Sequence, residues 1–339
     1  MEQFQKNTDY KKFVIDSRLQ YFKPHATKIE KTFAEEISFS LNQNLKFIDP
    51  KFFYDVQGSK LFEEICLLPE YYPTRTEINI LQNMKNDLPS FIDDDFRLVE
   101  FGSGSSVKTR LIFDVFTKLQ DKLEYFPIDV SEILAESSEQ LLKDYEKLHI
   151  TGIIDTYEGG LEFLKTYDEK KNLIIFLGSS FGNFSVNAGY AFLEKIYSAM
   201  KSDDLFLIGL DLVKDSQILE SAYNDSQGIT AQFNLNVLSR INDELDADFN
   251  LSNFKHHALY NEKDQRIEMY LKSLTNQSIM ISKSNLSLHL KKDELIHTEY
   301  SRKFRLSEIN ELLVSVGFKI KNMWLDDDKN FSLTLVSKI

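Results

Sequence analysis

The middle of the chain alternates short apolar runs with longer amphipathic stretches. Each apolar run is long enough for one β-strand, and the stretches between them carry apolar residues at helical spacing. Strands that alternate with helices through short turns predict a parallel sheet covered by helices on both faces. We expect strands at residues 97–101, 123–128, 150–154, 173–177 and 204–210, and helices at 107–119, 131–148 and 188–200.

The regions on either side of this alternation have other patterns. Residues 1–50 are polar and predict helix, whereas period-two alternation beyond residue 255 predicts antiparallel strands. We therefore expect a nucleotide-binding sheet with an inserted subdomain at about 213–298, against which the N-terminal segment packs. The further elements expected are helices at 29–44, 59–68, 76–81, within 215–250 and at 307–316, and strands at 266–271, 286–290, 318–325 and 331–336.

The composition is that of a globular protein with an acidic surface. Hydrophobic residues make up 42% of the chain and charged residues 27%, and the formal net charge is −13. We expect no nucleic acid and no membrane as partner, because proteins that bind them carry basic patches. The polar start of the chain and the shortness of the longest apolar run, residues 173–177, indicate a cytoplasmic protein that acts on small molecules.

The cysteine and histidine residues exclude several kinds of site. Cys66 is the only cysteine, which excludes an intrachain disulfide and a multi-cysteine zinc or iron–sulfur site. None of the six histidines has HExxH or similar spacing, and the adjacent pair at 256–257 would face opposite sides of a strand. We therefore expect no metal ion.

A glycine-rich turn links the first predicted strand of the sheet to its helix. Gly102 and Gly104 let a ligand approach the backbone, and the helix amino end offers unpaired N–H groups, so the turn suits an adenosine cofactor. The dinucleotide fingerprint fails because Val107 stands where its third glycine would be, and the P-loop pattern is absent. Glu100, two residues before the first glycine, resembles the E-x-G-x-G turn of class I S-adenosylmethionine (SAM) methyltransferases. The alternative is an ordinary strand–turn–helix with incidental glycines.

A second loop follows the fourth predicted strand at the same edge of the sheet. It has the sequence Gly-Ser-Ser-Phe-Gly-Asn at 178–183. Ligands of open α/β sheets bind outside the carboxyl ends of the strands. The amide of Asn183 can both donate and accept hydrogen bonds, which suits a zwitterionic amino acid. The alternative is an asparagine chosen for its tolerance of turn conformations.

Long, ordered motifs extend the resemblance from about residue 30 to the end of the chain. Together they are similar to the L-histidine Nα-methyltransferases of ergothioneine biosynthesis. The motifs are FFYDVQGSKLFEEI at 52–65, LPEYYPTRTE at 68–77, VEFGSGSSVKTR at 99–110, PIDVS at 127–131, LGSSFGNFS at 177–185, DLVKD at 211–215, AYND with GITAQFNLNVLSRINDEL within 222–245, RIEMYL at 266–271 and TEYSRKF at 298–304.

The resemblance implies a class I methyltransferase fold, that is, an α/β Rossmann-like and mostly parallel sheet, with a second α+β domain for the substrate. The methyltransferase domain would comprise residues 60–212 and 299–339, and the discontinuous substrate-binding domain residues 1–59 and 213–298. It also implies a monomeric enzyme that transfers three methyl groups in turn from SAM to the α-amine of L-histidine, which yields hercynine.

The same motifs imply which residues bind the cofactor. Gly102 and Lys108 belong to the cofactor turn, and Asp129 holds the ribose hydroxyls. Thr156 and Tyr157 occupy the position where the family has Asp-Phe beside the adenine. This departure leaves Asp155 or a backbone carbonyl as the alternative acceptor for the adenine amine.

The substrate residues implied by the resemblance form two groups. Around the amino-acid backbone the motifs place Tyr71, Asn183 and Tyr223, and near the α-amine they place Tyr54, whose hydroxyl, or a chain of water, would carry the proton in catalysis. Around the imidazole they place Glu299 and Ser301. Tyr300 between these two is bulkier than the valine expected there, and changes little if it points away from the pocket.

Three other functions compete with this interpretation. The first is a methyltransferase for another free amino acid, against which Glu299 and Ser301 argue because both suit an imidazole. The second is a non-catalytic protein that binds SAM or an amino acid, against which the presence of both half-sites argues. The third is a nicotinamide-dependent dehydrogenase, which the missing third glycine disfavours.

Overall fold

A nine-stranded, mostly parallel sheet organises one half of the molecule. The computed structural model describes residues 9–25, 31–102, 106–130 and 134–339, so Gly104 and the expected helix start at Ser131 lie outside the described residues. In spatial order the strands are β1 (Tyr10–Val14), β2 (Leu19–Pro24), β5 (Leu148–Ile154), β4 (Leu123–Asp129), β3 (Phe96–Phe101), β6 (Lys171–Phe176), β7 (Leu205–Asp211), β14 (Phe331–Lys338) and β13 (Phe318–Leu325).

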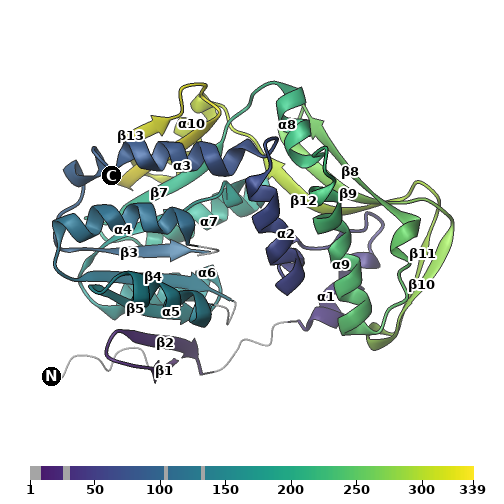
Figure 1. The fold of residues 1–339 in the computed structure, drawn as a ribbon, viewed down its shortest axis with the longest axis horizontal. Helices are drawn as coiled ribbons and strands as arrows, with labels where there is room; N and C mark the ends of the chain where they lie inside the picture. The colour runs from purple at the N-terminus through teal and green to yellow at the C-terminus, as the bar shows by residue number, and fades with distance from the viewer. Residues whose placement is uncertain (1–8, 26–30, 103–105, 131–133) are drawn as a thin grey trace.

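Helices cover both faces of this sheet, as the alternation of the sequence predicted (Figure 1). One apolar core joins the sheet to α3 (Tyr72–Met84), α4 (Val107–Leu119) and α5 (Leu134–Asp144). The other joins it to α6 (Tyr157–Tyr167), α7 (Val186–Ala199) and α10 (Leu306–Val316). The chain order reverses between β3 and β6, and β14 is antiparallel to β7. The predicted α/β class with a mostly parallel sheet is confirmed.

The second half of the molecule holds helices and short antiparallel strands around two further apolar cores. In Figure 1 this half lies to the right of the sheet, and α2 is its helix on the side that faces the sheet. Its helices are α1 (Phe33–Leu41), α2 (Val56–Leu67), α8 (Ser216–Tyr223) and α9 (Ile229–Leu245), and its strands are β8 (Phe254–Asn261), β9 (Arg266–Ser273), β10 (Gln277–Ile281), β11 (Leu286–Leu290) and β12 (Leu295–Arg302). Short 3₁₀ turns occur at η1 (Pro50–Phe53), η2 (Leu88–Ser90), η3 (Ser180–Asn183), η4 (Leu251–Asn253) and η5 (Ser282–Ser284).

The N-terminal segment differs from its prediction. Residues 10–24 form β1 and β2 rather than helix, and β2 pairs in parallel with β5 at the edge of the large sheet. Leu19 and Tyr21 face one core of the sheet and Phe22 the other, which supplies the burial that holds the strand in place. These residues therefore belong with the sheet, whereas the sequence placed them in the substrate-binding domain.

Two further differences concern the bounds of elements. The proposed boundary between residues 298 and 299 falls inside β12, which pairs with β9 on both sides of a register shift between His297 and Glu299. Helix α6 was not expected, because Gly159 and Gly160 lower the helical propensity of its first turn. Thr156 compensates as the N-cap, since its side chain accepts a hydrogen bond from the Gly159 N–H.

In the described part of the chain, no helix is both long and apolar enough to cross a bilayer.

Candidate active site

The residues implied for the cofactor gather at the carboxyl edge of the sheet. Gly102 follows β3, Asp129 ends β4 and Thr156 comes two residues after β5. Because β3 lies between β4 and β6, these ends flank the point where the strand order reverses. In doubly wound sheets this crevice is the usual place for a nucleotide.

The backbone at Gly102 adopts a conformation that favours glycine. Its φ is +68°, a left-handed conformation that side chains disfavour. A Cβ placed on Gly102 would also lie 3.1 Å from the hydroxyl of Tyr157 on α6. Burial raises the pKa of the Tyr157 phenol, so this hydroxyl stays a hydrogen-bond donor at neutral pH. Both residues therefore fit an adenosine group in the crevice.

Glu100, which first suggested the cofactor turn, is buried beneath it. Its carboxylate accepts hydrogen bonds from the Thr109 hydroxyl, at 2.8 and 3.0 Å, and from the Tyr125 hydroxyl. Burial raises the pKa of Glu100 to about 7, while these two donors oppose the rise. Glu100 thus ties the turn to α4 and β4.

The two side chains considered as acceptors for the adenine amine already have partners. The Thr156 hydroxyl accepts from the Gly159 N–H at 3.2 Å as the cap of α6. Asp155 accepts from the Thr156 N–H at 2.7 Å and from the hydroxyl of Tyr10 on β1. The sequence did not predict this last contact, because β1 was not expected. The role of Thr156 or Asp155 toward adenine stays a prediction.

A buried carboxylate links the cofactor helix to the second loop. The Nζ of Lys108, in the first turn of α4, lies 2.6 Å from Glu77 Oε2 on α3. Both Glu77 oxygens also accept from the Gly178 N–H at 3.0 Å, and the Glu77 side chain is fully buried. Glu77 was part of a quoted motif but had no role in the sequence-based site. Glu77 therefore fixes the position of α4 relative to the loop after β6.

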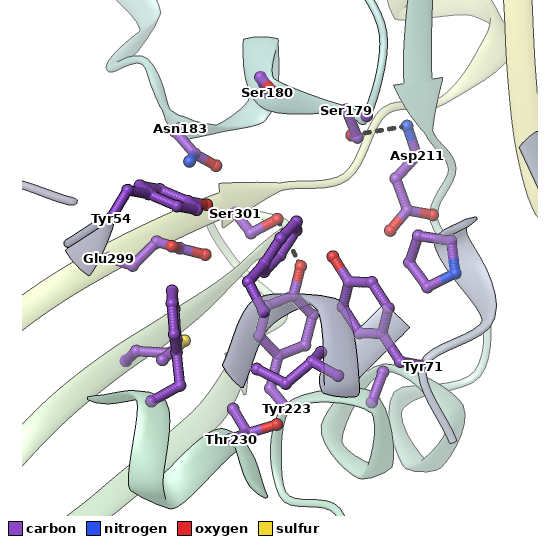
Figure 2. Close-up of a pocket in the computed structure, with 17 residues that line it drawn as sticks. Tyr54, Tyr71, Ser179, Ser180, Asn183, Asp211, Tyr223, Thr230, Glu299 and Ser301 are labelled. Carbon is purple, nitrogen blue, oxygen red and sulfur yellow. Dashed lines mark hydrogen bonds between the residues drawn. The ribbon is translucent and has the colours of Figure 1, made fainter. Parts of the chain in front are cut away.

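A pocket beside this loop brings together all six residues that the motifs implied for catalysis and substrate binding: Tyr54, Tyr71, Asn183, Tyr223, Glu299 and Ser301. Figure 2 shows the Asn183 amide, the Tyr54 hydroxyl and the Glu299 carboxylate directed toward one space. Gly178 lines the same pocket, whereas the five cofactor residues described above do not. The remaining lining residues are Phe62, Ile65, Pro73, Ser179, Ser180, Asp211, Ala222, Thr230, Phe233 and Met269.

The alternation of β12 explains how its motif reaches the pocket. Glu299 and Ser301 are two residues apart and share one face of the strand, and both line the pocket. Tyr300 faces the other side, where its ring packs 3.8 Å from the ring of His297 and 3.8 Å from the guanidinium of Arg266. Tyr300 therefore points away from the pocket, and its bulk leaves the site unchanged.

Glu299 is the one acidic side chain of the pocket that accepts no hydrogen bond from the described residues. Only 8% of it is exposed. Burial raises the pKa of Glu299 to about 7, and the nearby Lys303 ammonium partly opposes the rise. Such a carboxylate gains by accepting a hydrogen bond from a ligand.

Tyr54 stands at the rim of the pocket. Its side chain is 43% exposed, and its ring makes edge contacts with Phe62 and Phe233. Desolvation of the hydroxyl, followed by the Glu299 charge, raises the pKa of the Tyr54 phenol. Tyr54 is therefore protonated at neutral pH and can orient a group, whereas it cannot act as an anionic base.

Sequence reasoning missed several polar residues around the pocket. Thr230 lines it with a buried hydroxyl. A buried cluster formed by Tyr72, Asp211, Lys214 and Lys303 lies against the pocket wall. All four residues stood in the quoted motifs LPEYYPTRTE, DLVKD and TEYSRKF, yet the motifs alone did not show which charges would meet.

Comparisons with known proteins show the family to which the chain belongs. The family model of the "Histidine-specific methyltransferase, SAM-dependent" matches residues 33–338. The "Histidine N-alpha-methyltransferase" of Mycobacterium tuberculosis (strain CDC 1551 / Oshkosh) is 36% identical over 304 residues, which cover 89% of this chain and 94% of that protein. The "L-tryptophan methyltransferase trpM" of Psilocybe serbica is 25% identical over 309 residues, which cover 83% of this chain and 85% of that protein.

Solved structures are similar at lower identity. The 1,6-didemethyltoxoflavin-N1-methyltransferase of Burkholderia thailandensis aligns with a TM-score of 0.42 and 9% identity, and the alignment covers 87% of this chain and 93% of that chain. The family model and the mycobacterial relative confirm the recognition from sequence, the dependence on SAM and the enzyme class. The chain belongs to the family of histidine-specific, SAM-dependent methyltransferases.

Proposed function

We propose that this enzyme trimethylates the α-amine of L-histidine to hercynine, as a cytoplasmic monomer that acts on the free amino acid. The observation that carries the proposal is that six side chains from distant segments line one pocket beside the cofactor edge. In this proposal Tyr71, Asn183 and Tyr223 hold the backbone of the amino acid. Glu299 and Ser301 hold the imidazole.

The cofactor edge supplies the other half of the reaction. SAM, when bound, supplies a methyl group on a positively charged sulfur. Gly102 and Tyr157 fit its adenosine part, since the glycine leaves the space that a Cβ would fill. We propose that Asp129 accepts from the ribose hydroxyls at the end of β4, and that Lys108 fixes the position of the turn through its ion pair with Glu77.

The protein has to orient a neutral amine. A free amino acid has an α-amine pKa above the value of about 8 found at a chain terminus, so the proton must leave before transfer. Because Tyr54 is itself protonated, we propose that it positions the amine and relays the proton: its oxygen accepts the proton of the amine while its own O–H proton passes to water at the open rim. Alignment of the reacting atoms can supply about 7–11 kcal/mol of the barrier reduction. The rings of Tyr54, Phe62 and Phe233 accommodate the cationic product through cation–π attraction.

Purified protein incubated with SAM and histidine is expected to yield products that carry one, two and three added methyl groups. Mass spectrometry of the amino-acid fraction measures this directly. Turnover of tryptophan or another amino acid in place of histidine would contradict the proposed substrate. Binding of both ligands without turnover would contradict the proposed catalysis.

Histidine recognition is expected to depend on the ionisation of Glu299. Burial raises its pKa to about 7, so the acceptor is present above about pH 7 and is lost as the pH falls through that value. The imidazole of histidine titrates nearby, at about 6.5. The ligand for this test must not titrate itself, and the ring of 1,2,4-triazolylalanine stays neutral. Its affinity for the enzyme is measured by calorimetry from about pH 5.5 to about pH 8.5.

Wild-type affinity for triazolylalanine is expected to fall about tenfold for each pH unit below 7. The Glu299→Gln variant is the control, because its amide keeps an acceptor oxygen and cannot titrate. Its affinity is expected to stay constant over the same range. A decline of equal slope in both proteins would show that another group titrates.

A further inference from the structure

A buried charge cluster lies directly behind the imidazole side of the pocket. Asp211, at the end of β7, is fully buried and lies between two lysines, 2.8 Å from Lys303 Nζ and 2.5 Å from Lys214 Nζ. The Tyr72 hydroxyl also donates to both Asp211 oxygens, at 2.8 and 2.7 Å. Burial would raise the pKa of Asp211, but the two lysines reverse the direction and lower it. The cluster is therefore a fixed anion between two cations.

Lys303 uses all three protons of its ammonium group. One goes to Asp211, one to the Ser301 hydroxyl at 2.9 Å and one to the Tyr223 hydroxyl at 3.1 Å. Burial alone would lower the pKa of Lys303, but the Asp211 carboxylate reverses the direction and raises it. Lys303 therefore stays charged and can only donate.

The Ser301 hydroxyl receives two hydrogen bonds from behind. Lys303 donates one, and the Tyr223 hydroxyl donates the other at 2.8 Å (Figure 2). A hydroxyl oxygen has two lone pairs, so both are occupied. The remaining group of Ser301 is its own O–H, which has no acceptor among the described residues and faces the pocket that Ser301 lines.

The wall of the pocket thus presents one donor and one acceptor of fixed kinds. Glu299, two residues away on β12, is the acceptor, and Ser301 is the donor. A ring that fits both must offer one N–H and one nitrogen lone pair. A neutral imidazole does so, whereas an imidazolium has no lone pair and an indole has no acceptor nitrogen.

We propose that Lys303 is a positioning residue that sets the hydrogen-bond polarity of Ser301 and so makes the enzyme select a ring with an acceptor nitrogen. The inference rests on the proposed histidine specificity and deepens it. Lys303 acts through Ser301 and Tyr223, and Asp211 holds it in place. Lys214 serves Asp211 from the other side, where it also donates to Tyr72 and to the Leu212 carbonyl, both at 2.6 Å.

The two isomers of β-pyrrolylalanine test this inference. Each keeps a ring N–H and carries a C–H where histidine has its acceptor nitrogen. With either isomer the buried Ser301 hydroxyl has no acceptor on the ring. We therefore expect the wild-type enzyme to prefer histidine over the better isomer by about 5- to 100-fold in kcat/KM. In Lys303→Met this preference is expected to fall to that of Ser301→Ala, and the double variant is expected to show no further fall.

Lys214→Met is the matched control. Like Lys303→Met, it removes one lysine ammonium that pairs with Asp211. Lys214, however, contacts neither Ser301 nor Tyr223 in the described structure. Its preference for histidine is expected to equal that of the wild type, even where its activity falls. An equal loss of activity toward histidine and pyrrolylalanine in Lys303→Met would overturn the inference, because a merely structural lysine affects both substrates alike.

Two further measurements keep the test decisive. If Lys303→Met fails to fold, Tyr223→Phe removes the other donation to Ser301 and is expected to lower the preference in part; an unchanged preference would count against the inference. Wild-type turnover of histidine tests the proposed function separately. The preference is also measured as a ratio of dissociation constants, so a protein that bound histidine without turnover would still support or contradict the role of Lys303.

Discussion

Replacing Glu299 by alanine is expected to lower kcat/KM for histidine by about 100-fold and to leave the affinity for SAM unchanged. The carboxylate is buried, faces the pocket and accepts no hydrogen bond from the described residues. A hydrogen bond to a charged group contributes about 1.5–3 kcal/mol, and an imidazole N–H left unpaired in the pocket adds its own desolvation cost. The KM and kcat for histidine measure the loss, and calorimetry with SAM measures cofactor binding.

Glu268→Ala is the control for this variant. Glu268 lies opposite Tyr300 on the neighbouring strand β9 and accepts from Arg266, Tyr270 and Asn261 on the side away from the pocket. Its loss is expected to lower stability while the KM for histidine stays within a few-fold of the wild-type value. A collapse of SAM affinity in Glu299→Ala would show that the glutamate belongs to the cofactor side.

The parallel sheet could be predicted from the sequence because its strands are buried on both faces. Runs such as Leu173–Leu177 are apolar throughout, and short turns separate them from helices with a clear apolar stripe. The pair β1 and β2 lacks this signal, since lysines interrupt it and β2 is buried only after it pairs with β5. The burial of a strand at the edge of a sheet depends on the strand with which it pairs. The local sequence pattern does not indicate which strand that is.

The candidate site could be predicted to the extent that motifs carry it. The resemblance implied that Glu299 and Ser301 hold one ring, and the period of a strand places both on the face that lines the pocket. The partners of Lys303 and Glu77 could not be predicted, because each lies across a different element, on β7 and on α4. A charged residue in a motif does not indicate by itself which opposite charge it meets after folding.

Glu77 joins three segments that are far apart in the sequence. Its helix α3 begins directly after Tyr71, its carboxylate accepts from the Gly178 N–H, and its ion partner Lys108 lies in the first turn of α4. The contact is close enough that a Cβ on Gly209 of β7 would lie 2.3 Å from Glu77 Oε1. The carboxylate therefore occupies space that the fold reserves for it.

Replacing Glu77 by alanine is expected to lower the free energy of unfolding by about 3–5 kcal/mol, because it leaves a buried N–H and a largely buried ammonium without their partner. Urea denaturation measures this as a lower midpoint at similar slope. Asp114→Ala is the matched control: it removes the partner of Lys85, an ion pair of 2.8 Å whose carboxylate is 44% exposed, whereas that of Glu77 is fully buried. Its cost is expected to stay below about 1 kcal/mol. Equal losses in the two variants would contradict the structural role of Glu77, since both break one lysine–carboxylate pair and only Glu77 also holds the loop.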